Sequence, residues 1–129
     1  MKTMDRIAIL TLLTAALVGA RGCGGVQATR AEARERATKT TCDRYADCKL
    51  IGPGLTYENR DACEIAWRST FDGMWPSADC EGRIDGKAFD VCLDRIGSTA
   101  CEGFDFITTL GLCSKQNVCI GAASDGGTD

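Results

Sequence analysis

Apolar side chains recur at helical spacing along most of this chain, and no useful stretch alternates between apolar and polar positions as a strand would. The pattern is clearest between Asn59, a favourable N-cap residue, and Pro76, which ends it. The inward positions of this segment are Cys63, Trp67, Phe71 and Met74 or Trp75. The segment is therefore predicted to be an amphipathic helix with an aromatic inward face.

A helix is also predicted before it, over residues 28–48. This helix ends ahead of the Gly52-Pro53-Gly54 turn, which cannot continue it. Its inward face is predicted to carry Thr38, Cys42, Tyr45 and Ala46.

Two further helices are predicted in the second half of the chain. One begins after Asp85, which serves as the N-cap, and ends at Gly97. Its inward side chains would be Ala88, Phe89, Cys92 and Ile96. A shorter helix, Asp105–Cys113, would place Phe106, Ile107 and Leu110 inside. The predicted fold class is therefore all-α, a small bundle of about four helices.

The start of the chain has the pattern of an export signal. Lys2 and Arg6 precede a 14-residue apolar run from Ile7 to Ala20, and small residues follow it before Cys23. The run is too short to span a bilayer, for which about 20 apolar residues are needed. Residues 1–22 are therefore predicted to be a cleaved signal peptide.

Two cleavage sites compete in this segment. Residues 20–23 (Ala-Arg-Gly-Cys) are similar to a bacterial lipobox, in which the cysteine is lipidated, although Leu usually stands in place of the Ala. Residues 18–20 (Val-Gly-Ala) suit ordinary signal peptidase and would release a soluble chain. The odd cysteine count favours lipid attachment at Cys23, because eight cysteines are then left to pair. Gly24 after this cysteine favours sorting to the outer membrane.

The eight later cysteines are predicted to form four disulfides. They are Cys42, Cys48, Cys63, Cys80, Cys92, Cys101, Cys113 and Cys119. Large apolar side chains are few for a domain of this length, so disulfides of about 2–4 kcal/mol each would decide whether it folds. Such bonds persist in an oxidising compartment, which favours a location outside the cytosol.

Helical placement limits which cysteines can pair. Cys42 and Cys48 would lie about 9 Å apart along one helix, whereas bridged Cα atoms are rarely more than about 7 Å apart. Each should therefore pair with another segment. Cys48 and Cys63 are about equally far from the Gly52-Pro53-Gly54 turn, so an antiparallel hairpin would bring them together. Cys48–Cys63 is the one specific disulfide that we predict.

The chain is predicted to have four parts. These are the signal peptide (1–22), a tether or helical stalk (23–37), a Cys-rich helical domain (38–120) and a disordered tail (121–129). Glu32 with Arg36, and Glu35 with Lys39, are spaced for i,i+4 ion pairs that would extend the first helix backwards as a stalk. A disordered tether is an equally favoured alternative.

Composition excludes several kinds of chemistry. The sequence has no histidine, so Ser-His-Asp, Cys-His and His-zinc sites cannot form. The cysteines lack the C-x2-C spacing of zinc and thioredoxin-type sites. From Cys23 onward, 12 Lys and Arg stand against 17 Asp and Glu, a formal net charge of −5, which offers no basic surface to nucleic acid. We predict no metal and no cofactor.

Carboxylates remain as the one candidate for acid–base chemistry. Asp43 with Asp47, and Asp90 with Asp94, are spaced to share a helix face, where one pKa of a pair could be raised. We interpret both pairs as solvated helix faces and predict no catalytic residue.

The cysteines and the residues between them match a known framework. The matching residues are Cys42, Cys48, Ile51, Gly52, Pro53, Tyr57, Asp61, Ala62, Cys63, Cys80, Ile84, Asp85, Cys92, Leu93, Ile96, Cys101, Asp105, Leu110, Cys113 and Cys119. With them the chain resembles a family of small bacterial lipoproteins of unknown function, labelled natural-product-biosynthesis lipoproteins. The resemblance implies export, lipidation at Cys23 and a Cys-stapled domain, and it implies no catalytic residue.

Together these observations predict a non-enzymatic binding or accessory module of the cell envelope. It would be a monomer attached to the membrane through lipid on Cys23, at the periplasmic or surface face of the outer membrane. It would bind a protein or a small molecule, and the resemblance implies an association with natural-product biosynthesis. The alternative is a secreted soluble Cys-rich helical effector or inhibitor, cleaved after Ala20. An enzyme that uses helix carboxylates is the least favoured interpretation.

Overall fold

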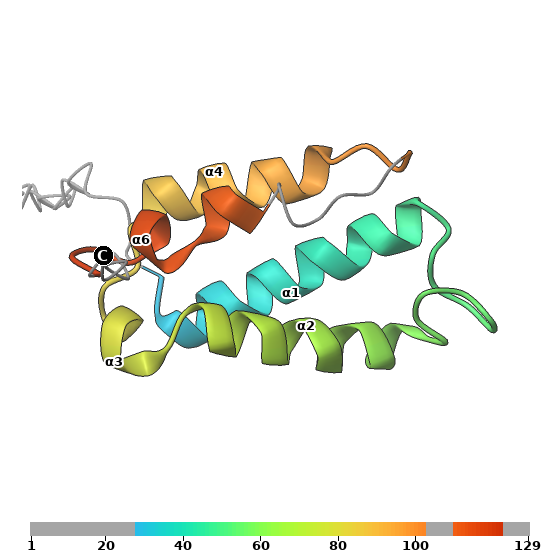
Figure 1. Ribbon diagram of the computed structural model, residues 1–129, viewed down its shortest axis with the longest axis horizontal. Helices are drawn as coiled ribbons and strands as arrows, with labels where there is room; N and C mark the ends of the chain where they lie inside the picture. Colours follow the sequence, from blue (N-terminus) through green and yellow to red (C-terminus); the bar gives the residue numbers. More distant parts are fainter. Residues whose placement is uncertain (1–27, 103–109, 123–129) are drawn as a thin grey trace, which may run out of the picture.

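Three helices form the body of the protein (Figure 1). The computed structural model describes residues 28–102 and 110–122. Helix α1 (Arg30–Asp47) lies antiparallel to α2 (Arg60–Met74) and parallel to α4 (Gly86–Ser98). The short helix α3 (Ser77–Cys80) follows α2, while η1 (Gly111–Cys113) and α6 (Lys115–Val118) pack against α4. The described residues contain two isolated β-bridges and no strand, so the all-α prediction is confirmed.

Some predictions fall on residues that are not described. The predicted signal peptide, Cys23, and the tail after Ala122 are among them, as is most of the predicted helix Asp105–Cys113. The end of that helix, from Gly111 to Cys113, is a 3-10 turn. Helix α6 was not predicted, and it adds the buried side chain of Val118 to the core.

Side-chain caps fix where the long helices begin. The Asn59 side chain accepts a hydrogen bond from the backbone N–H of Ala62 at 2.9 Å, and Asp85 accepts one from Ala88 at 3.0 Å. Both predicted N-caps are therefore confirmed. Helix α4 continues to Ser98, one residue beyond the predicted stop.

The core is built on the predicted inward face of α2. Cys63, Trp67, Phe71 and Trp75 are buried there. A chain of ring contacts runs through Tyr57, Tyr45, Trp67, Phe71, Trp75 and Phe89, with centroids 4.9–6.0 Å apart. The Trp75 indole N–H also donates to the carbonyl of Cys113 at 2.7 Å, which joins the aromatic core to η1. On α1, Ala46 is exposed instead of inward, and Thr41 is buried.

The first half of α1 belongs to the bundle, which corrects the predicted boundary at residue 38. Ala33 and Ala37 are fully buried. The Arg30 guanidinium donates to the carbonyl of Trp75 and forms an ion pair with Asp72 at 2.9 Å. Residues 30–37 are therefore neither a free stalk nor a disordered tether, because packing against the end of α2 holds them in place.

Four disulfides join the helices, as predicted, and all eight cysteines after Cys23 take part. The pairs are Cys42–Cys63, Cys48–Cys101, Cys80–Cys119 and Cys92–Cys113. Six of these cysteines are buried, whereas Cys48 is half-buried and Cys101 exposed.

The predicted Cys48–Cys63 pairing is wrong. The helices are joined by residues 48–59 and not by a tight reversal at Gly52, so Cys48 lies beyond the last turn of α1. Cys63 is in the first turn of α2, opposite Cys42. Because α4 runs parallel to α1, the segment after α4 brings Cys101 to the same end of the bundle as Cys48.

Candidate interaction surfaces

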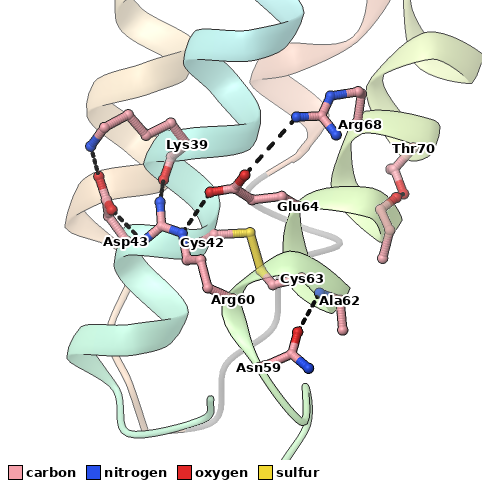
Figure 2. Close-up of a disulfide and its surroundings, with 11 residues drawn as sticks. Lys39, Cys42, Asp43, Asn59, Arg60, Ala62, Cys63, Glu64, Arg68 and Thr70 are labelled. Atoms are coloured by element: carbon pink, nitrogen blue, oxygen red, sulfur yellow. Dashed lines mark hydrogen bonds and ion pairs between the residues drawn. A yellow bond between two sulfur atoms is a disulfide. The ribbon is translucent and has the colours of Figure 1, made fainter. Parts of the chain in front are cut away.

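Ion pairs run along the edge where α1 meets α2, which we call the α1–α2 seam (Figure 2). Arg60 lies at its centre, with its guanidinium 2.7 Å from Asp43 and 2.7 Å from Glu64. Lys39 also pairs with Asp43, at 2.6 Å. Arg68, two turns further along α2, reaches back to α1. Arg68 therefore joins α2 to α1 a second time, after Arg60.

The seam continues past Arg68 to the start of α1. Arg68 pairs with Glu35 at 2.9 Å. Arg30 and Arg34 both contact Asp72, at 2.9 and 3.0 Å. The two i,i+4 ion pairs expected from the sequence, Glu32 with Arg36 and Glu35 with Lys39, give way to other contacts. Glu35 pairs with Arg68 on α2, Lys39 pairs with Asp43 one turn further along α1, Arg36 contacts Asp90 at 3.5 Å, and Glu32 accepts hydrogen bonds from Thr29 in the capping box of α1.

Two carboxylates of the seam are held in the charged form. Hydrogen bonds from Arg68, followed by those from Arg34, lower the pKa of Glu35. Burial alone would raise the pKa of Asp43, but hydrogen bonds from Lys39 and Arg60 outweigh it and lower that pKa overall. A lowered pKa suits a structural ion pair and does not suit a proton donor at neutral pH.

The acidic pairs considered as acid–base groups lie within this pattern of ion pairing. Asp43 is shared between Lys39 and Arg60, and Asp90 contacts Arg36. Among the described residues, no group of three or more His, Cys, Asp and Glu side chains is arranged to hold a metal ion.

The loop between α1 and α2 is held in one defined shape. Gly52 N–H donates to the carbonyl of Tyr57, and Tyr57 N–H donates to Leu50, at 2.8 and 3.2 Å. Gly52 and Gly54 have φ values of 152° and 76°, which L side chains rarely adopt, so glycine is required there. Leu55 lies at the tip and is 49% exposed.

Two tyrosine rings pack together where this loop meets α1. The rings of Tyr57 and Tyr45 meet edge to face, with centroids 5.0 Å apart. Burial, followed by the neighbouring Tyr57, raises the pKa of Tyr45 to about 12. The Tyr45 hydroxyl therefore stays neutral at any physiological pH and serves to anchor the loop.

A second apolar area lies on the outer side of α4. Val91 and Leu112 are 49% and 41% exposed, and they line two adjoining shallow hollows. Asp94 and Arg95 border one hollow, and Lys87 borders the other. The charges around this patch are of mixed sign, so they select no particular ligand.

These features define the class of protein: an all-α domain in which four disulfides fasten a small aromatic core. Residues 42–121 match a family of unknown function, DUF6184, and the chain belongs to that family. The matched region nearly coincides with the Cys42–Cys119 framework, while nothing in the match links the chain to natural-product biosynthesis. No curated protein and no solved structure matches the chain.

The family match and the fold begin at different places. The match starts at Cys42, in the middle of α1, although the helix begins at Arg30 and its first half is packed in the core. Among the described residues, no helix is both long and apolar enough to cross a bilayer.

Proposed function

We propose that this chain is an exported binding module that is held at the cell envelope by lipid on Cys23. The observation that carries the proposal is the cysteine count. The sequence has nine cysteines, and the eight after Cys23 pair with one another. An unpaired cysteine in an exported protein calls for modification or an intermolecular bond. Its place directly after a short apolar signal segment suits lipidation.

The disulfides also support the compartment. Four bonds in a domain of this size indicate an oxidising environment, either periplasmic or extracellular. A lipoprotein cysteine carries several acyl chains, and two or more membrane signals give stable anchoring where a single chain gives only marginal binding. The outer membrane is the proposed destination, on the basis of Gly24.

Binding is proposed in preference to catalysis because of where the polar groups lie. The carboxylates of the α1–α2 seam are used in ion pairs, and the pKa values of Glu35 and Asp43 are lowered. The remaining features suited to contact are exposed apolar side chains. Among the described residues they are Leu55 on the loop, Ile65 on α2, Val91 on α4, Leu112 in η1, and Ile120. The partner is a protein or a small molecule. A role beside natural-product biosynthesis rests on the resemblance alone, and the proposal does not depend on it.

Intact mass of the mature protein, purified from its native envelope, tests the proposal. We expect a chain that begins at Cys23 with the added mass of acyl groups. Reduction should then add eight hydrogen atoms, two for each disulfide. The matched control is Cys23→Ser, which keeps all four disulfides and should move from the detergent phase to the aqueous phase on partitioning.

Two results would overturn the proposal. A chain that begins at Arg21 without added mass would establish the secreted, soluble alternative. A gain of fewer than eight hydrogen atoms on reduction would show that the later cysteines do not all pair, and the cysteine count would then no longer single out Cys23.

A further inference from the structure

The packing of the first turns of α1 limits how the domain can be oriented at a membrane when lipid is attached to Cys23. Arg30 and Arg34 bind Asp72 on the last turn of α2, and Ala33 is fully buried. The helix is thus fixed to the bundle from its first residue. The spacer between the lipid and the folded domain therefore consists only of the residues that precede α1.

That spacer is short. Five residue steps separate Cys23 from Ala28, the first described residue, and a fully extended chain covers no more than about 18 Å over that length. Helix α1 has 18 residues and is about 27 Å long. The start of α1 therefore has to stay near the lipid surface, whereas the far end of the helix is free to point away from it.

We propose that the end of the bundle formed by the start of α1, the end of α2 and α3 faces the bilayer, and that the loop of residues 50–58 is the most distant part of the body. This rests on the proposed lipidation of Cys23. Figure 1 shows the start of α1 and α3 at one end of the molecule and the loop at the other. The end of the bundle at the start of α1 would thus contact the lipid bilayer, and the loop would face the surrounding compartment.

Exposed chemistry supports this choice of end. Gly73, Ser77 and Ala78 are exposed there and carry no charge, and Asp79 beside them is paired with Lys115 at 3.3 Å. Glu32, which caps the start of α1, and Glu81, which follows α3, are the exposed carboxylates beside them. If the bundle lay on its side along the whole α1–α2 seam, the carboxylates of Glu35 and Asp43, whose side chains are 47% and 44% exposed, would also lie against the lipid headgroups. The net charge of −5 from Cys23 onward is repelled by anionic headgroups, which attract basic segments.

The loop is well suited to be the outward end. Its backbone is already ordered by the hydrogen bonds between Gly52, Tyr57 and Leu50, so a partner would pay little ordering entropy on binding it. Its tip presents Leu55, which is 49% exposed.

The test uses the mature chain, residues 23–129, produced with its four disulfides formed and with Cys23 as the single free thiol. This thiol is coupled to a maleimide-headgroup lipid in phosphatidylcholine vesicles that contain a headgroup nitroxide quencher. A small fluorescent amino acid replaces Ala78, Leu55 or Val91, one at a time, all of which are exposed. Ser77 provides a second site at the α3 end, in case the Ala78 variant does not fold.

We expect quenching at Ala78 or Ser77 to exceed quenching at Leu55 and Val91 several-fold. Equal quenching at all positions, or the strongest quenching at Leu55, would overturn the inference. The strongest quenching at Val91 would also overturn it and would show that the apolar patch on α4 rests on the membrane. Labelled protein mixed with vesicles that lack the maleimide lipid is the control and should show no quenching.

Failure of this inference and failure of the proposed function can be told apart. Chemical coupling fixes the attachment at Cys23 whether or not cells lipidate it, so the quenching pattern reports geometry alone. Intact mass of the native protein reports lipidation alone.

Discussion

Removal of the Cys48–Cys101 disulfide should destabilise the protein chiefly through the unfolded state. The double variant Cys48→Ser with Cys101→Ser removes the least buried of the four disulfides, since Cys101 is exposed and Cys48 half-buried. Serine is close to cysteine in size, and its hydroxyl can reach water at these two positions. The substitutions therefore leave little folded-state cost apart from the lost cross-link.

The magnitude follows from the length of chain that this bond closes. Its cysteines are 53 residues apart, and the chain-entropy relation gives about 4 kcal/mol for a loop of that length. The Cys92–Cys113 bond, with a separation of 21, gives about 3 kcal/mol by the same relation. Typical domains have a total unfolding free energy of about 5–15 kcal/mol, so either loss would be a large fraction.

Guanidinium unfolding followed by circular dichroism, without reductant, measures the effect. The matched control is Cys92→Ala with Cys113→Ala, which opens the shorter loop but also removes two fully buried sulfur atoms and leaves a cavity. We expect the double variant Cys48→Ser with Cys101→Ser to lower the unfolding free energy by about 4 kcal/mol and to raise the dependence of that free energy on denaturant concentration. A loss below about 1 kcal/mol, with the other three disulfides intact, would refute the claim that this cross-link stabilises the fold.

Three further changes test other parts of the structure. The Thr41 hydroxyl is buried with no hydrogen-bond partner among the described residues, so Thr41→Val should stabilise the protein by about 1 kcal/mol in the same unfolding assay. Trp75→Phe removes the hydrogen bond to the Cys113 carbonyl and leaves a void in the core, so the melting temperature should fall, with a loss of about 2 kcal/mol or more. The folded-state pKa values of Glu35 and Asp43 lie below their ordinary values of 4.5 and 3.8, so the stabilisation is complete above those values and should be lost as pH falls through the lowered ones. A pH titration of stability in Glu35→Gln should show a smaller loss in acid than the unchanged chain does.

The sequence predicts local structure well where a single residue determines it. Asn59 and Asp85 are N-caps because their side chains satisfy a free N–H in the first helical turn, which depends on nothing outside the segment. The aromatic face of α2 was predictable for a related reason, because three aromatic side chains at helical spacing, Trp67, Phe71 and Trp75, can be buried only together.

Features that depend on how helices lie beside one another could not be predicted in this way. The pairing of Cys48 with Cys101 needs α4 to run parallel to α1, which no local pattern encodes. The ion pairs of the seam likewise depend on the relative rotation of α1 and α2. The i,i+4 spacing within α1 therefore predicts a Glu35–Lys39 pair, whereas in the fold Glu35 meets Arg68.

The disulfide arrangement explains why such a small core is sufficient. The Cys42–Cys63 bond ties α1 to α2, and the Cys48–Cys101 bond ties the end of α1 to the segment that follows α4. The other two bonds attach the C-terminal segment to α3 and α4, and its described residues 110–122 place Val118, Cys113 and Cys119 in the core, with Leu110 and Ala122 packed against it. Two of the four disulfides hold this segment to the rest of the domain, so reduction should release it first. Stability of the whole domain is thereby linked to an oxidising compartment, the same compartment in which a lipid on Cys23 would hold it.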